Sequence, residues 1–198
     1  MADFLEIFET PNNNKPRPWF QERIREGFRY KDYLSWGDEF RSEIIDGMVY
    51  LMAGASIWHQ NMIVELIHQL KLFFKDRTCT PFVAPVDVRL FPQDDLCDTT
   101  VVQPDILVVC DKTKIHPKYI RGVPDLIIEI MSNSSEGYDR ITKKKLYERA
   151  GVREYWIVAE NQIYRYHLQD GKYIESVYDY SAGFKLNPVI FPDCTLEF

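Results

Sequence analysis

The chain has 198 residues, of which 45% are hydrophobic and 14% aromatic, and this composition indicates a globular protein and excludes a disordered one. Its apolar runs are shorter than the roughly 20 residues that span a bilayer, and its start lacks the pattern of a secretory signal, so we expect a cytoplasmic protein with no membrane anchor. The net charge of −6 argues against general affinity for a polyanion, although charge can still be local.

The first elements follow from turn and capping signals. Residues 1–29 are expected to form an arm that is partly irregular, because PNNNKPRP has no periodicity. A short helix is expected at 30–35. In SEIIDGMVYLM, Asp46-Gly47 lies between two apolar runs and predicts a β-hairpin. Ser56 is a suitable N-cap for a helix that ends near Lys75. The apolar residues of this helix have helical spacing: Ile63, Leu66, Ile67, Leu70 and Phe74.

The centre and tail of the chain alternate between strands and one further helix. Strands are expected at 82–90, 106–110, 126–131 and 154–159, and a helix at about 138–150. Asp170-Gly171 predicts a second hairpin between strands at 162–168 and 172–180. The order of helix, three strands, helix and strand indicates a single α+β domain over residues 30–198.

Glu129 interrupts the apolar strand LIIEIM, which has the pattern of a central strand buried on both faces. An ionised carboxylate there is costly unless it is paired, hydrogen-bonded or bound to a metal. The sequence therefore leaves two interpretations, a buried ion pair with an Arg or Lys, or a metal ligand or general base.

Three aspartates near the same strands are weaker candidates. Asp105 follows Pro104 at the start of ILVVC, where an ordinary turn is an equal alternative. Asp125 repeats the Pro-Asp step four residues before Glu129, and a turn is sufficient to explain it. Asp87 alternates with Pro85 and Arg89, which favours a solvated position on a polar face.

The helix after Glu129 distinguishes among three consecutive lysines. On a helical wheel, Lys143 falls on the inward side with the residues Asp139, Leu146, Tyr147 and Ala150. Lys144 and Lys145 fall elsewhere. A solvated charge run predicts no such difference, so Lys143 is a candidate for the site. The alternative is a helical pair with Asp139 in which the lysine extends to solvent.

The remaining candidates are local. His59 lies in the first turn of the long helix, four residues before Ile63, and a core or cap histidine is the preferred interpretation. Glu43 precedes the first hairpin strand, and its two equal interpretations are a side chain that reaches a neighbouring metal and an exposed residue at the strand edge. Two stretches are basic, KTKIHPKYIR and RITKKKLYER.

The four cysteines, Cys79, Cys97, Cys110 and Cys194, are far apart in the chain and contain no CxxC pair. A zinc site or a disulfide framework needs clustered or patterned cysteines. We therefore expect reduced thiols that are mostly packed in the interior.

The runs QPDILVV, GVPDLIIEIMSNSS and DRITKKKLYERAGVREYWIV together resemble the Uma-two-type endonucleases of the PD-(D/E)xK restriction-endonuclease-like superfamily. The similarity extends from about Tyr30 to the C-terminal strands. It implies an αβββαβ core, with an N-terminal β-hairpin and a β-rich C-terminal extension. Where the superfamily's simplest motif has its lysine, this chain has Met131, and the family's lysine from the following helix corresponds to Lys143.

The resemblance implies a metal-dependent endonuclease that acts on nucleic acid, DNA more than RNA, and that forms a homodimer. Asp105 and Glu129, with the carbonyl of Ile130, would hold Mg²⁺ or Mn²⁺, and Lys143 would act on the attacking water or the developing charge. Further residues are expected to lie around these ligands and support them: Glu43, His59, Asp87, Asp125, Asp139 and Tyr147. Four basic residues are expected to contact the nucleic-acid backbone: Lys114, Lys118, Arg121 and Lys144. A catalytically silent binding or assembly protein and a small-molecule phosphoesterase are the alternatives.

Overall fold

The computed structural model describes residues 27–36, 41–52, 54–131 and 139–198, with only the backbone described for Asp139 and Arg140. These residues form two compact units. The first comprises the described part of Met1–Gly54 with Arg89–Val102, and the second comprises Ala55–Val88 and Gln103–Phe198. Of the predicted arm at 1–29, residues 1–26 lie outside the described residues. The single domain over 30–198 stays a prediction.

The first unit contains the predicted hairpin. Strands β1 (Ser42–Ile45) and β2 (Met48–Leu51) pair in antiparallel fashion, and β1 also pairs with β5 (Val101–Val102). In the hairpin turn, Asp46 and Gly47 have φ angles of 50° and 77°. A tight two-residue turn that matches the twist of its strands needs positive φ at both positions, which explains the Asp-Gly pair. A short helix α1 (Tyr30–Tyr33) and a 3₁₀ turn η2 (Asp94–Leu96) complete this unit.

A buried ion pair stabilises the first unit. The Arg89 guanidinium donates from Nε and Nη2 to Asp98 Oδ2, at 2.9 and 2.6 Å, and the two residues are 3% and 0% exposed. Asp98 Oδ1 also accepts the Gln93 N–H at 3.0 Å. The expectation that Arg89 lies on a polar, solvated face is therefore wrong. Its counter-charge comes from a loop nine residues further on, which strand alternation does not reveal.

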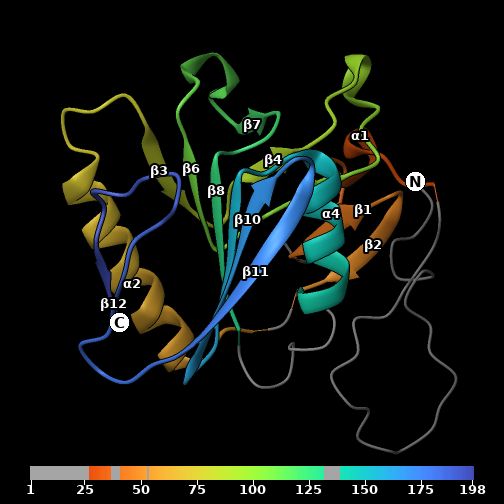
Figure 1. Ribbon diagram of the computed structural model, residues 1–198. Helices are drawn as coiled ribbons and strands as arrows, with labels where there is room; N and C mark the ends of the chain where they lie inside the picture. The colour runs from red at the N-terminus through yellow and green to blue at the C-terminus, as the bar shows by residue number, and fades with distance from the viewer. Residues whose placement is uncertain (1–26, 37–40, 53, 132–138) are drawn as a thin grey trace, which may run out of the picture. The chain divides into compact units, whose positions relative to one another are not determined.

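The second unit is built around a six-stranded sheet with the order β11-β10-β9-β8-β6-β3. Strands β8 and β9 run parallel, and the other neighbours are antiparallel. Helices α2 and α4 lie on opposite sides of these strands (Figure 1). The strands of the sheet are β3 (Thr80–Val83), β6 (Ile106–Val109), β8 (Leu126–Ile130), β9 (Glu154–Val158), β10 (Gln162–Gln169) and β11 (Lys172–Asp179). The smaller elements are β4 (Asp87–Arg89), which crosses the boundary between the units, η3 (Lys112–Lys114), β7 (Tyr119–Arg121), β12 (Lys185–Leu186) and β13 (Leu196–Glu197).

Helix α2 (Ile57–Phe73) covers one face of this sheet. Its start is capped as predicted, because Ser56 Oγ accepts the His59 N–H at 3.1 Å. Leu66 and Leu70 are fully buried, and they belong to one core cluster with residues from the strands: Ile106, Val108, Leu126, Ile128, Ile130, Trp156 and Val158. The predicted helix and its apolar stripe are confirmed, and burial of this stripe against the strands supplies most of the driving force for docking α2.

Helix α4 (Lys144–Ala150) lies against the other face and is preceded by a π-helical turn, Asp139–Lys143. Lys143 and Tyr147 are 4% and 0% exposed, whereas Lys145 is exposed. The helical wheel thus selected the buried lysine correctly. The helix ends at Gly151, whose φ of 85° is readily accessible to glycine. The π turn was not predicted; wider turns of this kind occur frequently at functional sites.

Two sequence predictions are wrong in the second unit. The single strand expected at 82–90 is divided into β3 and β4, and Pro85, which lies between them, has no N–H for a ladder hydrogen bond. Cys79 and Cys110 form a disulfide, so the expectation of four reduced cysteines fails. Thr80 pairs with Val109 across β3 and β6, which places the two flanking cysteines opposite each other. Cys97 and Cys194 are free.

The C-terminal hairpin of β10 and β11 is confirmed, with its turn at Asp170 and Gly171. Strand β11 forms one edge of the sheet. The Glu148 carboxylate on α4 accepts the main-chain N–H of Tyr173 at 2.8 Å and the Lys172 ammonium at 3.1 Å. Among the helices in the described ranges, none combines the length and apolar character needed to cross a membrane.

Candidate active site

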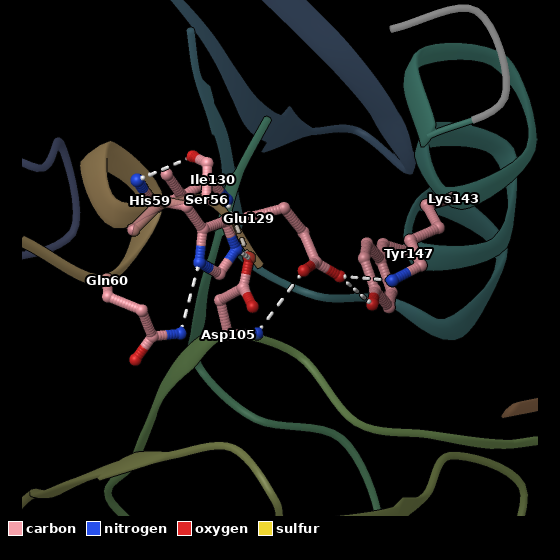
Figure 2. Close-up of polar contacts among 8 residues, drawn as sticks. All are labelled: Ser56, His59, Gln60, Asp105, Glu129, Ile130, Lys143 and Tyr147. Atoms are coloured by element: carbon pink, nitrogen blue, oxygen red, sulfur yellow. Dashed lines mark hydrogen bonds and ion pairs between the residues drawn. The ribbon is translucent and has the colours of Figure 1, made fainter. Parts of the chain in front are cut away.

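Asp105 and Glu129 approach each other at the end of two central strands. The register of β6 and β8 pairs Ile106 with Ile128, and its continuation places Asp105 opposite Glu129. The Asp105 N–H donates to Glu129 Oε2 at 3.2 Å, and the Ile130 N–H donates to Asp105 Oδ2 at 2.8 Å (Figure 2). The amide of Asp105 therefore holds the Glu129 carboxylate, and the amide of the residue after Glu129 holds the Asp105 carboxylate.

Glu129 is 5% exposed and lies on the α4 face of the sheet, since its neighbours Ile128 and Ile130 pack in the α2 core. Its Oε1 accepts two hydrogen bonds from the helical segment, from Lys143 Nζ at 2.7 Å and from Tyr147 Oη at 2.9 Å. The ion pair that the sequence left as an alternative is present, and its cation is the lysine that the helical wheel selected. The metal-ligand or general-base interpretation of Glu129 stays a prediction.

His59 extends this constellation from α2. Its Nε2 lies 3.1 Å from Asp105 Oδ2, and its Nδ1 lies 3.5 Å from Gln60 Nε2 (Figure 2). The side chains of His59 and Asp105 remain 14% and 13% exposed, so this side of the site is more accessible than Glu129. The preferred sequence interpretation, a core or cap histidine, missed this contact. The helical phase of His59 was visible in the sequence, but its partner on β6, 46 residues away, was not.

Two other aspartates have separate partners. Asp125 accepts the Cys110 N–H at 2.8 Å and pairs with Arg153 at 3.2 Å, which matches the turn role considered for it. Four residues of strand separate it from Glu129, or about 13 Å. Asp87 is half-buried and accepts a hydrogen bond from Gln103 Nε2 at 2.9 Å, so the solvated position expected for it is not observed.

Two further predicted positions, Glu43 and Asp139, stay predictions. Glu43 belongs to β1 of the first unit and is 2% exposed, so an exposed strand-edge position is excluded. The side chain of Asp139, and with it the proposed pair with Lys143, lies outside the described residues.

The predicted nucleic-acid contacts do not gather at the Asp105–Glu129 pair. Lys114, Lys118 and Arg121 lie in the connection that leaves β6 and returns to β8, whereas Asp105 precedes β6 at its other end. Five residues of extended chain from Asp105 to Cys110 span about 16 Å. Lys114 donates to the Val123 carbonyl at 2.9 Å. Lys144 pairs with Glu175 at 2.9 Å and lies over the Tyr166 ring at 4.5 Å.

The donor set of the pair fits a hard divalent cation. Magnesium and manganese favour oxygen ligands, and such ions are commonly held by one or two carboxylates together with water and substrate phosphate. Asp105 and Glu129 supply these carboxylates, and Asp105 keeps part of its surface exposed. Within the described ranges no three His, Cys, Asp or Glu side chains form a ready cage for a metal. An ion here would therefore need main-chain, water or phosphate oxygens as well.

Asp105 just before β6, Glu129 on the adjacent β8 and Lys143 from the following helical segment have the arrangement expected of a restriction-endonuclease-like protein. The structure is similar to a solved chain described as a "putative nuclease belonging to DUF820 from Anabaena variabilis ATCC 29413", with a TM-score of 0.66 and 17% sequence identity over 84% of this chain and 92% of that one. The fold is thus the mixed α+β fold expected from the sequence.

The chain belongs to the Uma2 family, described as "Putative restriction endonuclease", whose model matches residues 30–197. Two relatives from Synechocystis sp. (strain ATCC 27184 / PCC 6803 / Kazusa) are named as uncharacterized proteins. The protein sll1609 is 28% identical over 63% of this chain and 69% of its own length. The protein slr1290 is 27% identical over 71% of this chain and 74% of its own length.

Proposed function

We propose that this protein is a divalent-metal-dependent endonuclease that hydrolyses phosphodiester bonds at the Asp105–Glu129 pair. One observation carries the proposal: a carboxylate buried on a central strand, Glu129, is held by a buried lysine and lies beside a second carboxylate that remains partly exposed. Burying two charges in this way costs free energy that apolar side chains of similar volume avoid. Membership of a nuclease family supports the same chemistry.

Asp105 and Glu129 would hold Mg²⁺ or Mn²⁺, with the Ile130 carbonyl as a further oxygen donor. When bound, such an ion compensates phosphate charge and makes water a stronger nucleophile at neutral pH. The main-chain amides of Asp105 and Ile130 each donate a hydrogen bond to one of the two carboxylates. His59 holds Asp105 Oδ2 from the side of α2, so Asp105 cannot rotate freely.

Lys143 brings a positive charge to the same place. Its ammonium, which has three donor hydrogens, lies 2.7 Å from Glu129 Oε1. An ammonium at the edge of a carboxylate pair can orient the attacking water and stabilise negative charge that develops on phosphate oxygens. Burial enhances this effect, because the local dielectric constant is lower than that of water.

The substrate is proposed to be nucleic acid, with DNA preferred over RNA; the family's description as restriction endonucleases supports this preference. The cations predicted to contact its backbone lie far from the pair or are engaged by protein groups, so they are not proposed to hold the scissile phosphate. Lys118 and Arg121 could contact phosphates several nucleotides away. A homodimer, which would let paired sites cut two strands, stays a prediction.

The proposal is tested by incubating the protein with supercoiled plasmid, linear duplex, branched DNA and RNA, each with Mn²⁺, Mg²⁺ or chelator. Asp105→Asn, Glu129→Gln and Lys143→Met are compared with Lys145→Met, which changes an exposed lysine of the same helix. We expect metal-dependent cleavage that the first three changes abolish and the fourth leaves intact. Thermal melts verify that each variant is folded.

Absence of cleavage on every substrate, with no effect of Mn²⁺ on the melting temperature, would contradict the proposal. The catalytically silent binding or assembly protein would then be the better description. Cleavage of nucleotides or other small phosphate esters, with no cleavage of polymers, would instead support the small-molecule phosphoesterase.

A further inference from the structure

Glu129 Oε1 receives two donors of different chemical character from one helical segment. Lys143 and Tyr147 are separated by one helical turn, and both reach the same oxygen, at 2.7 and 2.9 Å (Figure 2). The other oxygen, Oε2, accepts the Asp105 N–H. A carboxylate oxygen offers about two lone-pair directions, so the helical segment occupies Oε1 and Oε2 is directed toward Asp105.

The two donors differ in charge and in mobility. Lysine carries a full positive charge on a flexible stem, whereas the phenol of tyrosine donates a hydrogen bond without a charge. Tyr147 is 0% exposed, and its ring packs edge-on against Tyr155 with centroids 4.8 Å apart. The Tyr147 hydroxyl is therefore fixed in position and leaves the negative charge of Glu129 available to a cation.

We propose that Tyr147 is the positioning residue of this site: its hydroxyl keeps Glu129 oriented for a divalent cation when Lys143 turns from Glu129 toward the substrate. This inference rests on the proposed function, because it assigns a role at the same metal site. A lysine that both anchored Glu129 and assisted hydrolysis would release the carboxylate whenever it acted. A second, neutral anchor on the same oxygen removes that conflict.

A purely structural hydroxyl makes a different prediction. If Tyr147 only satisfied a buried acceptor, its loss would lower the free energy of unfolding and leave metal affinity unchanged. Tyr173 provides the matched control. It is also a buried tyrosine of the second unit, but its hydroxyl donates to the Val152 carbonyl, at 2.9 Å, and not to a carboxylate.

The experiment measures the Mn²⁺ affinity of the wild type, Tyr147→Phe and Tyr173→Phe, by calorimetric titration and by the rise in melting temperature. We expect Tyr147→Phe to weaken Mn²⁺ binding about tenfold or more, the usual cost of removing a group that orients a metal ligand. Tyr173→Phe should melt at a lower temperature and bind Mn²⁺ as the wild type does. A Tyr147→Phe protein with wild-type Mn²⁺ affinity overturns the inference and leaves the proposed function standing.

Lys143→Met provides a second measurement. In that background Tyr147 still donates to Oε1 while the lysine donor is gone, so adding Tyr147→Phe should weaken Mn²⁺ binding more than it does in the wild type. Equal effects in both backgrounds would also count against the inference. A wild-type protein that shows no response to Mn²⁺ would contradict the proposed function itself, and the proposed role of Tyr147 as well.

Discussion

Asp105 and Glu129 are linked by two hydrogen bonds, each from a main-chain amide of one strand to the side-chain carboxylate that the other strand presents. The Asp105 amide donates to Glu129, and the amide that follows Glu129 donates to Asp105, at 3.2 and 2.8 Å. Because these amides belong to the adjacent strands, the sheet itself contributes to the orientation of both carboxylates, in addition to the side chains that contact them. A constellation held in this way approaches the preorganisation that electrostatic catalysis requires.

The buried lysine can be distinguished from its exposed neighbour by stability alone. Lys143→Met leaves the Glu129 carboxylate buried without its cation, and we expect a loss of about 3 kcal/mol in the free energy of unfolding, the lower end of the range for such pairs, because Tyr147 and the Asp105 amide still donate to it. Lys145→Met should change stability by less than about 0.5 kcal/mol. Urea denaturation of both variants provides the comparison.

A double replacement separates the cost of an unpaired charge from the value of the pair. Glu129→Leu with Lys143→Met removes both charges, and we expect it to recover most of the stability that Lys143→Met loses. It should have no nuclease activity. A double variant as unstable as Lys143→Met would show that the lost stability does not come from an uncompensated charge.

The ion pair of the first unit should matter for folding and not for metal binding. Arg89→Met leaves Asp98 buried with its main-chain donor but no cation, and we expect a destabilisation of about 3 to 5 kcal/mol. Arg41→Met, which changes an exposed arginine of the same unit, should have little effect. Denaturation midpoints measure the difference, and equal midpoints would contradict the importance of the pair.

Cysteine alkylation tests the disulfide and the two free thiols. Without reductant, Cys97 should react first, because it is half-exposed. Burial raises the pKa of the Cys194 thiol to about 11, so at pH 8 only about one molecule in a thousand carries the reactive thiolate. Cys79 and Cys110 should react only after reduction. Mass spectrometry of the native protein should show one rapid adduct, and three or four would exclude the disulfide.

The contact of Glu148 with β11 should make the free energy of unfolding depend on pH in the acidic range. The Tyr173 amide, and then Lys172, lower the pKa of the Glu148 carboxyl in the folded state. Its contribution is therefore present above the unfolded pKa, about 4.3 for glutamate, and is lost as the pH falls through the folded value. The difference in urea midpoint between wild type and Glu148→Gln should shrink from pH 7 to pH 3. A difference that is constant over this range would argue against the assignment.

Local signals in the sequence predicted most elements of the second unit and both hairpins. The Asp-Gly turns, the Ser56 cap and the apolar stripe of α2 each depend on neighbours within a few residues. They can therefore be predicted without knowledge of the tertiary structure. Lys143 could be selected for the same reason, since helical phase alone separates it from Lys145. Glu129 was identified because a carboxylate contradicts the apolar pattern of its own strand.

Contacts between distant segments were the part that could not be predicted. His59 meets Asp105 across 46 residues, and Cys79 meets Cys110 across 31. Both depend on the sheet register, which turn and cap signals do not specify for strands that are far apart in sequence. The division of the strand at 82–90 was indicated by Pro85, but the apolar run around it favoured one continuous strand.

The carboxylate that α4 places on the Tyr173 amide has a consequence for association between molecules. An outer strand with unpaired amides invites another chain to extend the sheet, and proteins often block such edges with charge. For a second molecule to add a strand alongside β11, it would have to displace Glu148 from that amide and bury the adjacent Lys172 and Glu175. This part of the sheet edge is therefore protected against pairing with a strand of another molecule.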